Sequence, residues 1–137
     1  MTVLHRSSAS LAAELGRHQR EAVAKINARI GNERARYITV APGQEMIYLA
    51  KEAEAARYVS ADPEPATMDD YPLLAADVGT LVATGYEAAQ LVLNLAAQWR
   101  QIGGQLEYAR RSAIAAVEGA TTPGEVQAAL EHFEAAL

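Results

Sequence analysis

Apolar residues recur at alternating steps of three and four positions along the C-terminal part of the chain. This apolar seam consists of Val92, Leu95, Trp99, Ile102, Leu106, Ala109, Ala113, Ala116 and Ala120. Heptad spacing of this kind places all members on one stripe of a helix that packs against another helix. Thr84 and Glu87 form a capping box just before the seam, so the pattern predicts one helix over about residues 85–119.

Two adjacent glycines, Gly103 and Gly104, lie inside this predicted helix and cost about 2 kcal/mol together relative to alanine. The step from Ile102 to Leu106 nevertheless keeps the heptad phase, which a hairpin loop has no reason to preserve, so we predict an unbroken helix. At 1.5 Å per residue it spans about 50 Å, more than the roughly 35–40 Å of a compact globule of this size. The seam is bulky up to Leu106 and lined by alanine beyond it, which predicts a local core at one end and a close-approach partner surface at the other.

A similarly long helix is predicted over about residues 8–37, with Ser8 or Ser10 as its N-cap. Its apolar stripe consists of Leu11, Leu15, Ala22, Val23, Ile26, Ile30 and Tyr37. Two polar residues, Gln19 and Glu33, interrupt this stripe. The partner of the seam is either this first helix or another copy of the chain.

A shorter helix is predicted between the two long ones, from about Gln44 to Val59. Its apolar face is expected to consist of Met46, Leu49, Ala50, Ala53 and Ala56. An extended connector over residues 37–43 precedes it, and an acidic, proline-rich loop over about residues 60–72 follows it. A short helix over residues 73–78 then ends at Gly79 as a C-cap.

A second capping box, formed by Thr122 and Glu125 with Pro123 at the first helical position, starts a terminal helix. The sequence therefore predicts an all-α protein. We expect an elongated helical bundle with two long helices (about 8–37 and 85–119), a shorter middle helix and a terminal helix, in a single domain over residues 1–137.

Composition agrees with thin, closely packed helices, because half of the residues are apolar but aromatic residues make up only 6%. The chain has no cysteine, which excludes disulfides and thiolate sites. No run approaches the roughly 18 apolar residues of a membrane-spanning helix, and the N-terminus lacks the apolar stretch and cleavage site of a signal peptide. We expect a soluble, unexported protein without a membrane partner.

Charge is distributed unevenly along the chain, whose net charge is -5. Residues 1–40 hold seven Lys/Arg against three Asp/Glu, whereas residues 41–137 hold five against fourteen. The two parts are expected to attract each other, within one chain or between copies. The basic residues scatter around the first helix without interleaved aromatics, so a solvated or self-complementary surface is preferred over nucleic-acid binding.

No residue pattern in the chain predicts catalysis or a cofactor. The histidines His5, His18 and His132 lack metal-ligand spacing, and nucleophile-elbow and phosphate-loop motifs are absent. The tripeptide at residues 103–105 is the one that peptide release factors use, but here it lies in a heptad helix. The acidic loop lacks a calcium-binding ladder, and Trp99 is interpreted as a core side chain of the bundle.

One ordered set of residues resembles a known family. The set comprises Ile26-Asn27-Ala28, Arg34, Tyr37-Ile38-Thr39, Pro42-Gly43-Gln44, Tyr48, Lys51-Glu52, Glu54-Ala55, Tyr71 to Gly79, Trp99, Glu107, Arg110 and Thr121-Thr122-Pro123. It is similar to short, alanine-rich proteins encoded among the tail genes of bacteriophages and prophages, near tail-fibre and fibre-assembly genes. The resemblance covers about residues 26–125 and implies a role in the tail or its assembly, without catalytic residues.

Within this resemblance, Tyr48 and Lys51-Glu52 are expected to lock the connector onto the bundle or to present a docking surface, and the structural role is preferred. The candidate interaction residues are Trp99, Leu106, Ala109, Ala113, Ala116, Tyr48 and Lys51. No metal-binding, cofactor-binding or catalytic residue is predicted.

The leading hypothesis is a non-enzymatic phage tail structural protein or fibre-associated adaptor that self-associates through helix seams. A closed ring or trimer is the expected form if it serves a symmetric tail. The alternatives are a tail-fibre assembly chaperone that is absent from the virion, and a small nucleic-acid-binding regulator. The expected location is the virion tail, or the host cytoplasm during assembly.

Overall fold

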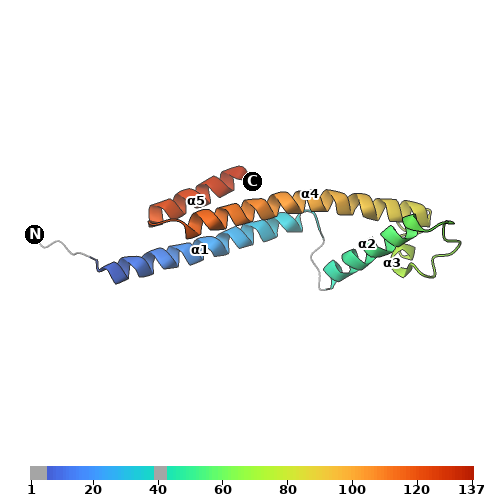
Figure 1. Ribbon diagram of the computed structural model, residues 1–137, viewed down its shortest axis with the longest axis horizontal. Coiled ribbons are helices and arrows are strands. Elements are labelled where there is room, and N and C mark those ends of the chain that lie inside the picture. The colour runs from blue at the N-terminus through green and yellow to red at the C-terminus, as the bar shows by residue number, and fades with distance from the viewer. Residues whose placement is uncertain (1–5, 39–42) are drawn as a thin grey trace, which may run out of the picture. The chain divides into compact units, whose positions relative to one another are not determined.

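A computed structural model describes residues 6–38 and 43–137, and all of the elements in these ranges are helices (Figure 1). They are α1 (Ser8–Ala35), α2 (Gln44–Ser60), α3 (Pro72–Ala75), α4 (Gly85–Glu118) and α5 (Pro123–Ala136). The predicted all-α class is confirmed, as are the two long helices, the shorter middle helix and the terminal helix. The connector residues 39–42 lie outside the described part.

The chain forms two compact units. Unit 1 consists of residues 1–36 and 103–137, and unit 2 consists of residues 37–102. Helix α4 contributes to both units and continues through Gly103 and Gly104 as predicted. The expectations of a single domain and of an elongated shape stay predictions.

Unit 1 combines α1, α5 and the second half of α4 around a narrow apolar core. Its buried apolar residues are Ala22, Ile26, Ile30, Leu106, Ala113, Ile114, Val117, Ala120, Val126 and Phe133. The predicted stripe of α1 is confirmed at its centre but is wrong at its ends, where Leu11 is 50% and Tyr37 is 52% exposed. Tyr37 follows the end of α1 at Ala35, so it has left the helical stripe.

The seam of α4 is confirmed in unit 1 at Leu106, Ala113 and Ala120, which are all buried. The expectation that alanine lines this half is confirmed at Ala113 and Ala120 but wrong at Ala116, which is exposed, and the branched Ile114 and Val117 complete the buried stripe. From Leu106 onward, buried residues recur every seven positions, at Ala113 and Ala120, and the branched side chains of Ile114 and Val117 are buried between these alanines. The predicted seam and the observed buried stripe have every seventh residue in common, so heptad spacing alone could not distinguish the two.

Gln19, which interrupts the predicted stripe of α1, has a structural role at the end of α4. Its side-chain Nε2 donates to the carbonyl oxygens of Val117 and Ala120, each at 3.2 Å. The last carbonyls of a helix have no partner within the helix. Gln19 therefore caps the C-terminus of α4 from a neighbouring helix.

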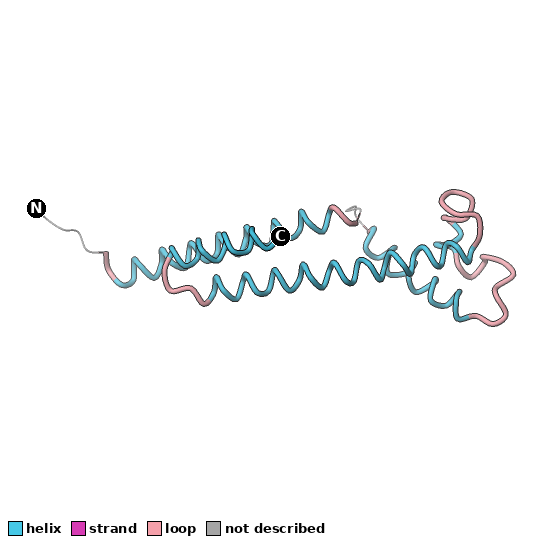
Figure 2. Tube along the Cα trace, turned by 90° about the horizontal axis from the view of Figure 1, so that it is seen from above, coloured by secondary structure: helices cyan, strands magenta, loops and turns pink. Residues whose placement is uncertain are grey.

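Unit 2 packs α2, α3 and the first half of α4 around a small core. The buried members of this core are Ala55, Tyr58, Tyr71, Leu74, Ala88 and Ala89, with Met68, Val78, Val82, Val92 and Leu93 packed against it. Gly85 allows the close approach of two of these side chains, because a Cβ there would lie 2.5 Å from Met68 Sδ and 2.9 Å from Tyr58 Oη. The loop over residues 61–71, shown in pink in Figure 2, joins α2 to α3.

Both predicted capping boxes are present. Thr84 Oγ1 accepts from Glu87 N at 3.1 Å, and Thr122 Oγ1 accepts from Glu125 N at 3.1 Å. The N-cap of α1 is Ser7, whose side chain accepts from the amide of Ser10. The prediction of Ser8 or Ser10 was therefore wrong by one or more positions, since both lie inside the helix.

Helix α3 is shorter than predicted. It ends at Ala75 instead of Val78, and Gly79, with a φ of +83°, belongs to the turn that follows. The amide of Gly79 donates to the carbonyl of Val82 at 2.7 Å. This turn replaces the last helical turn because it returns Val78 and Val82 to the core of unit 2.

Candidate interaction surface

The inner side of α2 carries a buried carboxylate that holds α3 in place. Glu54 is 6% exposed, and its side chain accepts the backbone N–H groups of Leu73 at 3.0 Å and Leu74 at 2.9 Å. The N-terminal amides of a helix lack intrahelical partners and carry partial positive charge. The carboxylate therefore satisfies these amides, and its own burial is compensated by their hydrogen bonds.

Two ion pairs flank this contact and hold the same side of α2 inward. Lys51 Nζ lies 2.7 Å from Asp77 Oδ2, and both side chains are largely buried. Glu52 pairs with Arg100 on α4. Together with Glu54, these polar contacts determine which side of α2 faces the core of unit 2.

The opposite side of α2 is apolar and uncovered. This α2 face consists of Met46, Leu49, Ala50, Ala53 and Ala56, all of them exposed. Met46 is 77% and Leu49 is 70% exposed. The predicted residues thus share one side of α2, and this side is exposed because the charged side chains on the opposite side have the contacts with the rest of unit 2.

An aromatic pair closes the other end of α2. The rings of Tyr58 and Tyr71 meet edge to face, with centroids 5.2 Å apart, and Arg57 lies over the Tyr71 ring. The Tyr58 hydroxyl donates to Glu64 at 2.8 Å, and this hydrogen bond together with burial raises the pKa of Tyr58. The cluster joins the acidic loop to the core, so Glu64 has a structural contact.

The candidate interaction residues are distributed over both units. Lys51 pairs with Asp77, which follows α3, and Tyr48 is 37% exposed. Their expected role in holding the connector stays a prediction. Trp99 and Ala109 are half-buried, Leu106 and Ala113 are buried, and Ala116 is exposed. The structure thus places Lys51 on the inner side of α2, opposite the α2 face.

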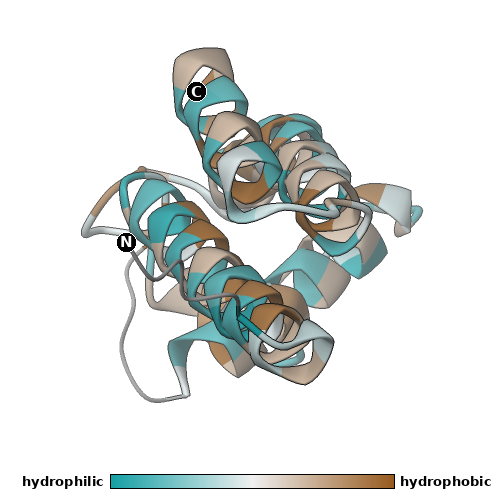
Figure 3. Cartoon of the chain, turned by 90° about the vertical axis from the view of Figure 1, so that its left-hand side faces the viewer, coloured by the Kyte–Doolittle hydropathy of each residue, from teal (hydrophilic) through white to brown (hydrophobic). Residues whose placement is uncertain are grey.

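Exposed apolar side chains concentrate in unit 2. Of the twelve large exposed apolar side chains among the described residues, nine belong to residues 37–102. Four of these follow one another at the start of α2, over residues 46–49. Figure 3 shows apolar (brown) and polar (teal) residues alternating along the helices. Large contiguous patches of exposed apolar side chains mark sites of interaction with other molecules.

Unit 1 instead covers its surface with ion pairs. Glu107 accepts from Arg110 at 2.7 Å and from Arg34 at 3.0 Å, and these contacts lower the pKa of Glu107 to about 2. Glu33, the second polar residue in the α1 stripe, pairs with Arg29 and Arg36. The hydrogen bond from Arg29 is the main cause that lowers the pKa of Glu33.

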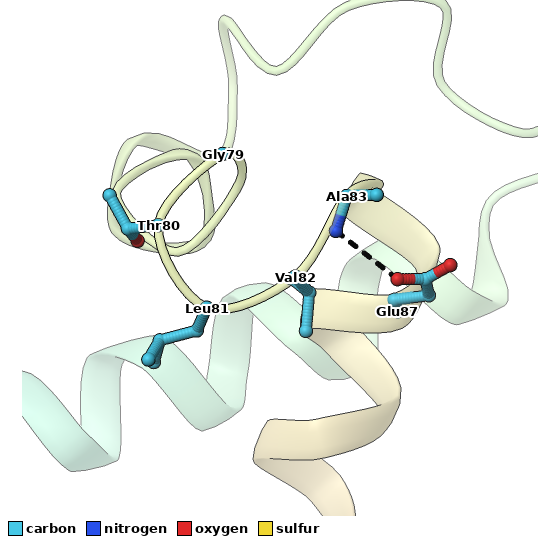
Figure 4. Close-up of a pocket in the computed structure, with 6 residues that line it drawn as sticks. All are labelled: Gly79, Thr80, Leu81, Val82, Ala83 and Glu87. Atoms are coloured by element: carbon cyan, nitrogen blue, oxygen red, sulfur yellow. Dashed lines mark hydrogen bonds between the residues drawn. The ribbon is translucent and has the colours of Figure 1, made fainter.

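The described residues form no group of three or more His, Asp or Glu side chains that could hold a metal ion. His18 lies 4.0 Å from Glu14 and His132 is exposed, while His5 lies outside the described residues. An open depression of about 380 Å³ lies at residues 79–83 and Glu87 (Figure 4). The Glu87 carboxylate at this depression accepts from the backbone N–H of Ala83 at 3.2 Å as part of the capping box, so Glu87 has a structural role.

Comparisons with protein-family models, curated proteins and solved structures found no match to this chain. No helix in the described part of the chain is long and apolar enough to cross a membrane.

Proposed function

We propose that this chain is a non-enzymatic structural or adaptor protein of a bacteriophage tail that associates with further copies of itself. The observation that carries the proposal is the uncovered α2 face, with Met46 and Leu49 presented to solvent. Side chains of this size gain about 1.5–3 kcal/mol each when they are fully buried. The tail setting is supported only by the sequence resemblance over about residues 26–125.

Two experiments test this function. Light scattering over a range of micromolar concentrations should show a mass that rises with concentration, and a strictly monomeric species would contradict self-association. Mass spectrometry of purified particles should detect the chain in the tail fraction. Absence from particles, together with capture by a fibre protein during assembly, would instead identify the chaperone alternative, which needs the same exposed face.

The ion pairs of α1 disfavour the nucleic-acid alternative. Five of the seven basic residues in the N-terminal part of the chain are paired with glutamates: Arg6, Arg17, Arg29, Arg34 and Arg36. Nucleic-acid affinity depends on basic side chains that neutralise phosphates. We therefore expect no salt-sensitive retention of DNA or RNA, and strong retention in a filter-binding assay would reverse this preference.

A further inference from the structure

The N-terminal turns of α1 extend past the end of the helix beside them. Gln19 lies level with the last residues of α4, because its side chain caps their carbonyls. Residues 8–13 of α1 are all exposed, and Figure 1 shows these turns projecting beyond the loop that joins α4 to α5. We call residues 8–18 the α1 end.

The α1 end carries the apolar stripe of α1 outward from the core. Leu11 and Leu15 lie on the same side of the helix as the buried Ala22, since they precede it by about three and two turns. Leu11 is 50% exposed and Leu15 is half-buried. The stripe thus continues past its partner helix, with no described residue covering Leu11 fully.

The α1 end and the α2 face have opposite charge environments. Residues 6–20, which contain the α1 end, hold three Lys/Arg against one Asp/Glu, whereas residues 37–102 hold three against nine. Glu45, an exposed residue of α2, borders the α2 face. Opposite charge over two apolar helix stripes favours their association and directs it.

We propose that the α2 face binds the α1 end of a second copy of this chain. The contact is a helix pair in which Leu11 and Leu15 of one copy pack against Leu49 and the small residues beside it on the other. Alanines at the contact let the two helices approach closely. This inference rests on the proposed self-association and specifies which surfaces carry it.

A symmetric contact between two α2 faces is disfavoured by charge. It would place the acidic unit 2 of one copy, with three Lys/Arg against nine Asp/Glu, against the same unit of the other. Like charges across an interface oppose association. The contact between unlike surfaces avoids this repulsion.

A contact between two different surfaces leaves one of each free on every pair, so further copies add until a ring closes or a filament grows. The α2 face has five residues, three of them alanine, whereas each side of a standard stable interface has about 20–30 residues. Each contact is therefore weak, and the association should depend on protein concentration and decrease as salt screens the charges.

The proposal is tested by blocking one surface at a time. Leu11→Glu removes the α1 end and Leu49→Glu removes the α2 face, and light scattering at low salt should show each variant as a monomer. An equimolar mixture of the two should form a dimer and nothing larger, because one intact contact remains. Tyr108→Glu, at a residue as exposed as Met46, is the matched control and should associate like the wild type.

Engineered cysteines test whether the α1 end and the α2 face lie next to each other, since the chain has no cysteine of its own. Under oxidising conditions Ser8→Cys mixed with Ala53→Cys should form a covalent dimer, whereas Ala53→Cys alone should not. Cross-linking of Ala53→Cys with itself, or a mixture of the glutamate variants that stays monomeric, overturns the proposal. Circular dichroism of every variant confirms that the helices remain.

The outcomes separate this inference from the proposed function. A wild-type chain that associates, with both glutamate variants unaffected, overturns the pairing of these surfaces and leaves self-association standing. A wild-type chain that stays monomeric overturns both the pairing and self-association. The tail role is then judged separately, by the mass spectrometry of particles.

Discussion

The two units of this chain both have small cores but differ in the side chains that they expose to solvent. Seven of the nine ion pairs of Lys or Arg among the described residues lie in unit 1, which exposes three of the twelve large exposed apolar side chains. Unit 2 has the other two ion pairs and nine of these apolar side chains. Unit 1 therefore meets solvent with charge, whereas unit 2 keeps apolar surface uncovered.

The comparison is informative because the two kinds of surface differ in energetic value. An exposed ion pair contributes about 0–1 kcal/mol, so the network of unit 1 adds little stability per pair but keeps that surface soluble. Burial of exposed apolar surface by a partner contributes about 25 cal/mol of favourable free energy for each Å² buried. Unit 2 thus has more exposed apolar surface whose burial would be favourable.

The largest expected effect separates the inner and outer sides of unit 2. Leu74 is fully buried, so Leu74→Ala should lower the free energy of unfolding by about 2–5 kcal/mol. Leu49→Ala, the same substitution on the α2 face, should change it by less than about 0.5 kcal/mol in the monomer. Urea unfolding measures both, and an equal loss would show that Leu49 is covered.

A smaller loss is expected when the carboxylate that holds α3 is removed. Glu54→Ala leaves the amides of Leu73 and Leu74 without their acceptor and should destabilise the chain by about 1–3 kcal/mol. Glu45→Ala, at an exposed residue of the same helix, serves as the control. If the two variants unfold at the same urea concentration, the carboxylate does not hold α3.

Two glycine substitutions should act in opposite directions in the two units. Gly85→Ala forces Met68 and Tyr58 apart and should cost about 1–3 kcal/mol. Gly31→Ala in α1 meets nothing within 4 Å, so it should stabilise the chain by about 0.5–1 kcal/mol. Thermal unfolding followed by circular dichroism provides the comparison, and a stabilising Gly85→Ala would contradict the close packing of unit 2.

The smallest effect concerns acid and belongs to unit 1. The folded-state pKa of Glu107 is about 2, below the ordinary value of 4.5, so its contribution is fully present above the ordinary value. That contribution is lost as the pH falls from about 4.5 towards 2. Glu107→Gln should therefore unfold more readily than the wild type at pH 7 and differ less from it at pH 3.

The matched control for the acid experiment is Glu118→Gln, since no ion pair of the Glu118 side chain is present among the described residues. It should follow the wild type at both pH values in urea unfolding. A constant difference between Glu107→Gln and the wild type from pH 7 to pH 3 would contradict the ion-pair explanation.

Much of the fold could be predicted from local patterns. The capping boxes at Thr84 and Thr122 located two helix starts because a cap is a contact within four residues. The heptad phase across Gly103 and Gly104 likewise predicted a continuous α4. The buried stripe of α4 beyond Leu106 was less predictable, since whether Val117 or Ala116 is buried depends on the angle at which the neighbouring helices pack against α4.

The candidate surface could not be predicted in the same way. Apolar periodicity identified Met46 and Leu49 as one face of α2 but did not indicate that this face is exposed. The position of Glu54 beside the first amides of α3 depends on a loop that brings residues about twenty positions apart together. No local pattern announces such a contact.

The sequence by itself determined the helices, their ends and which residues share a side, because these follow from interactions within one or two helical turns. Only the tertiary structure decided which side of α2 faces inward and which polar residues are buried. The reason is that burial of a charge depends on a partner that arrives from a distant segment. Glu54 and Lys51 have such partners, as does the amide of Gln19, whereas the apolar face of α2 is exposed.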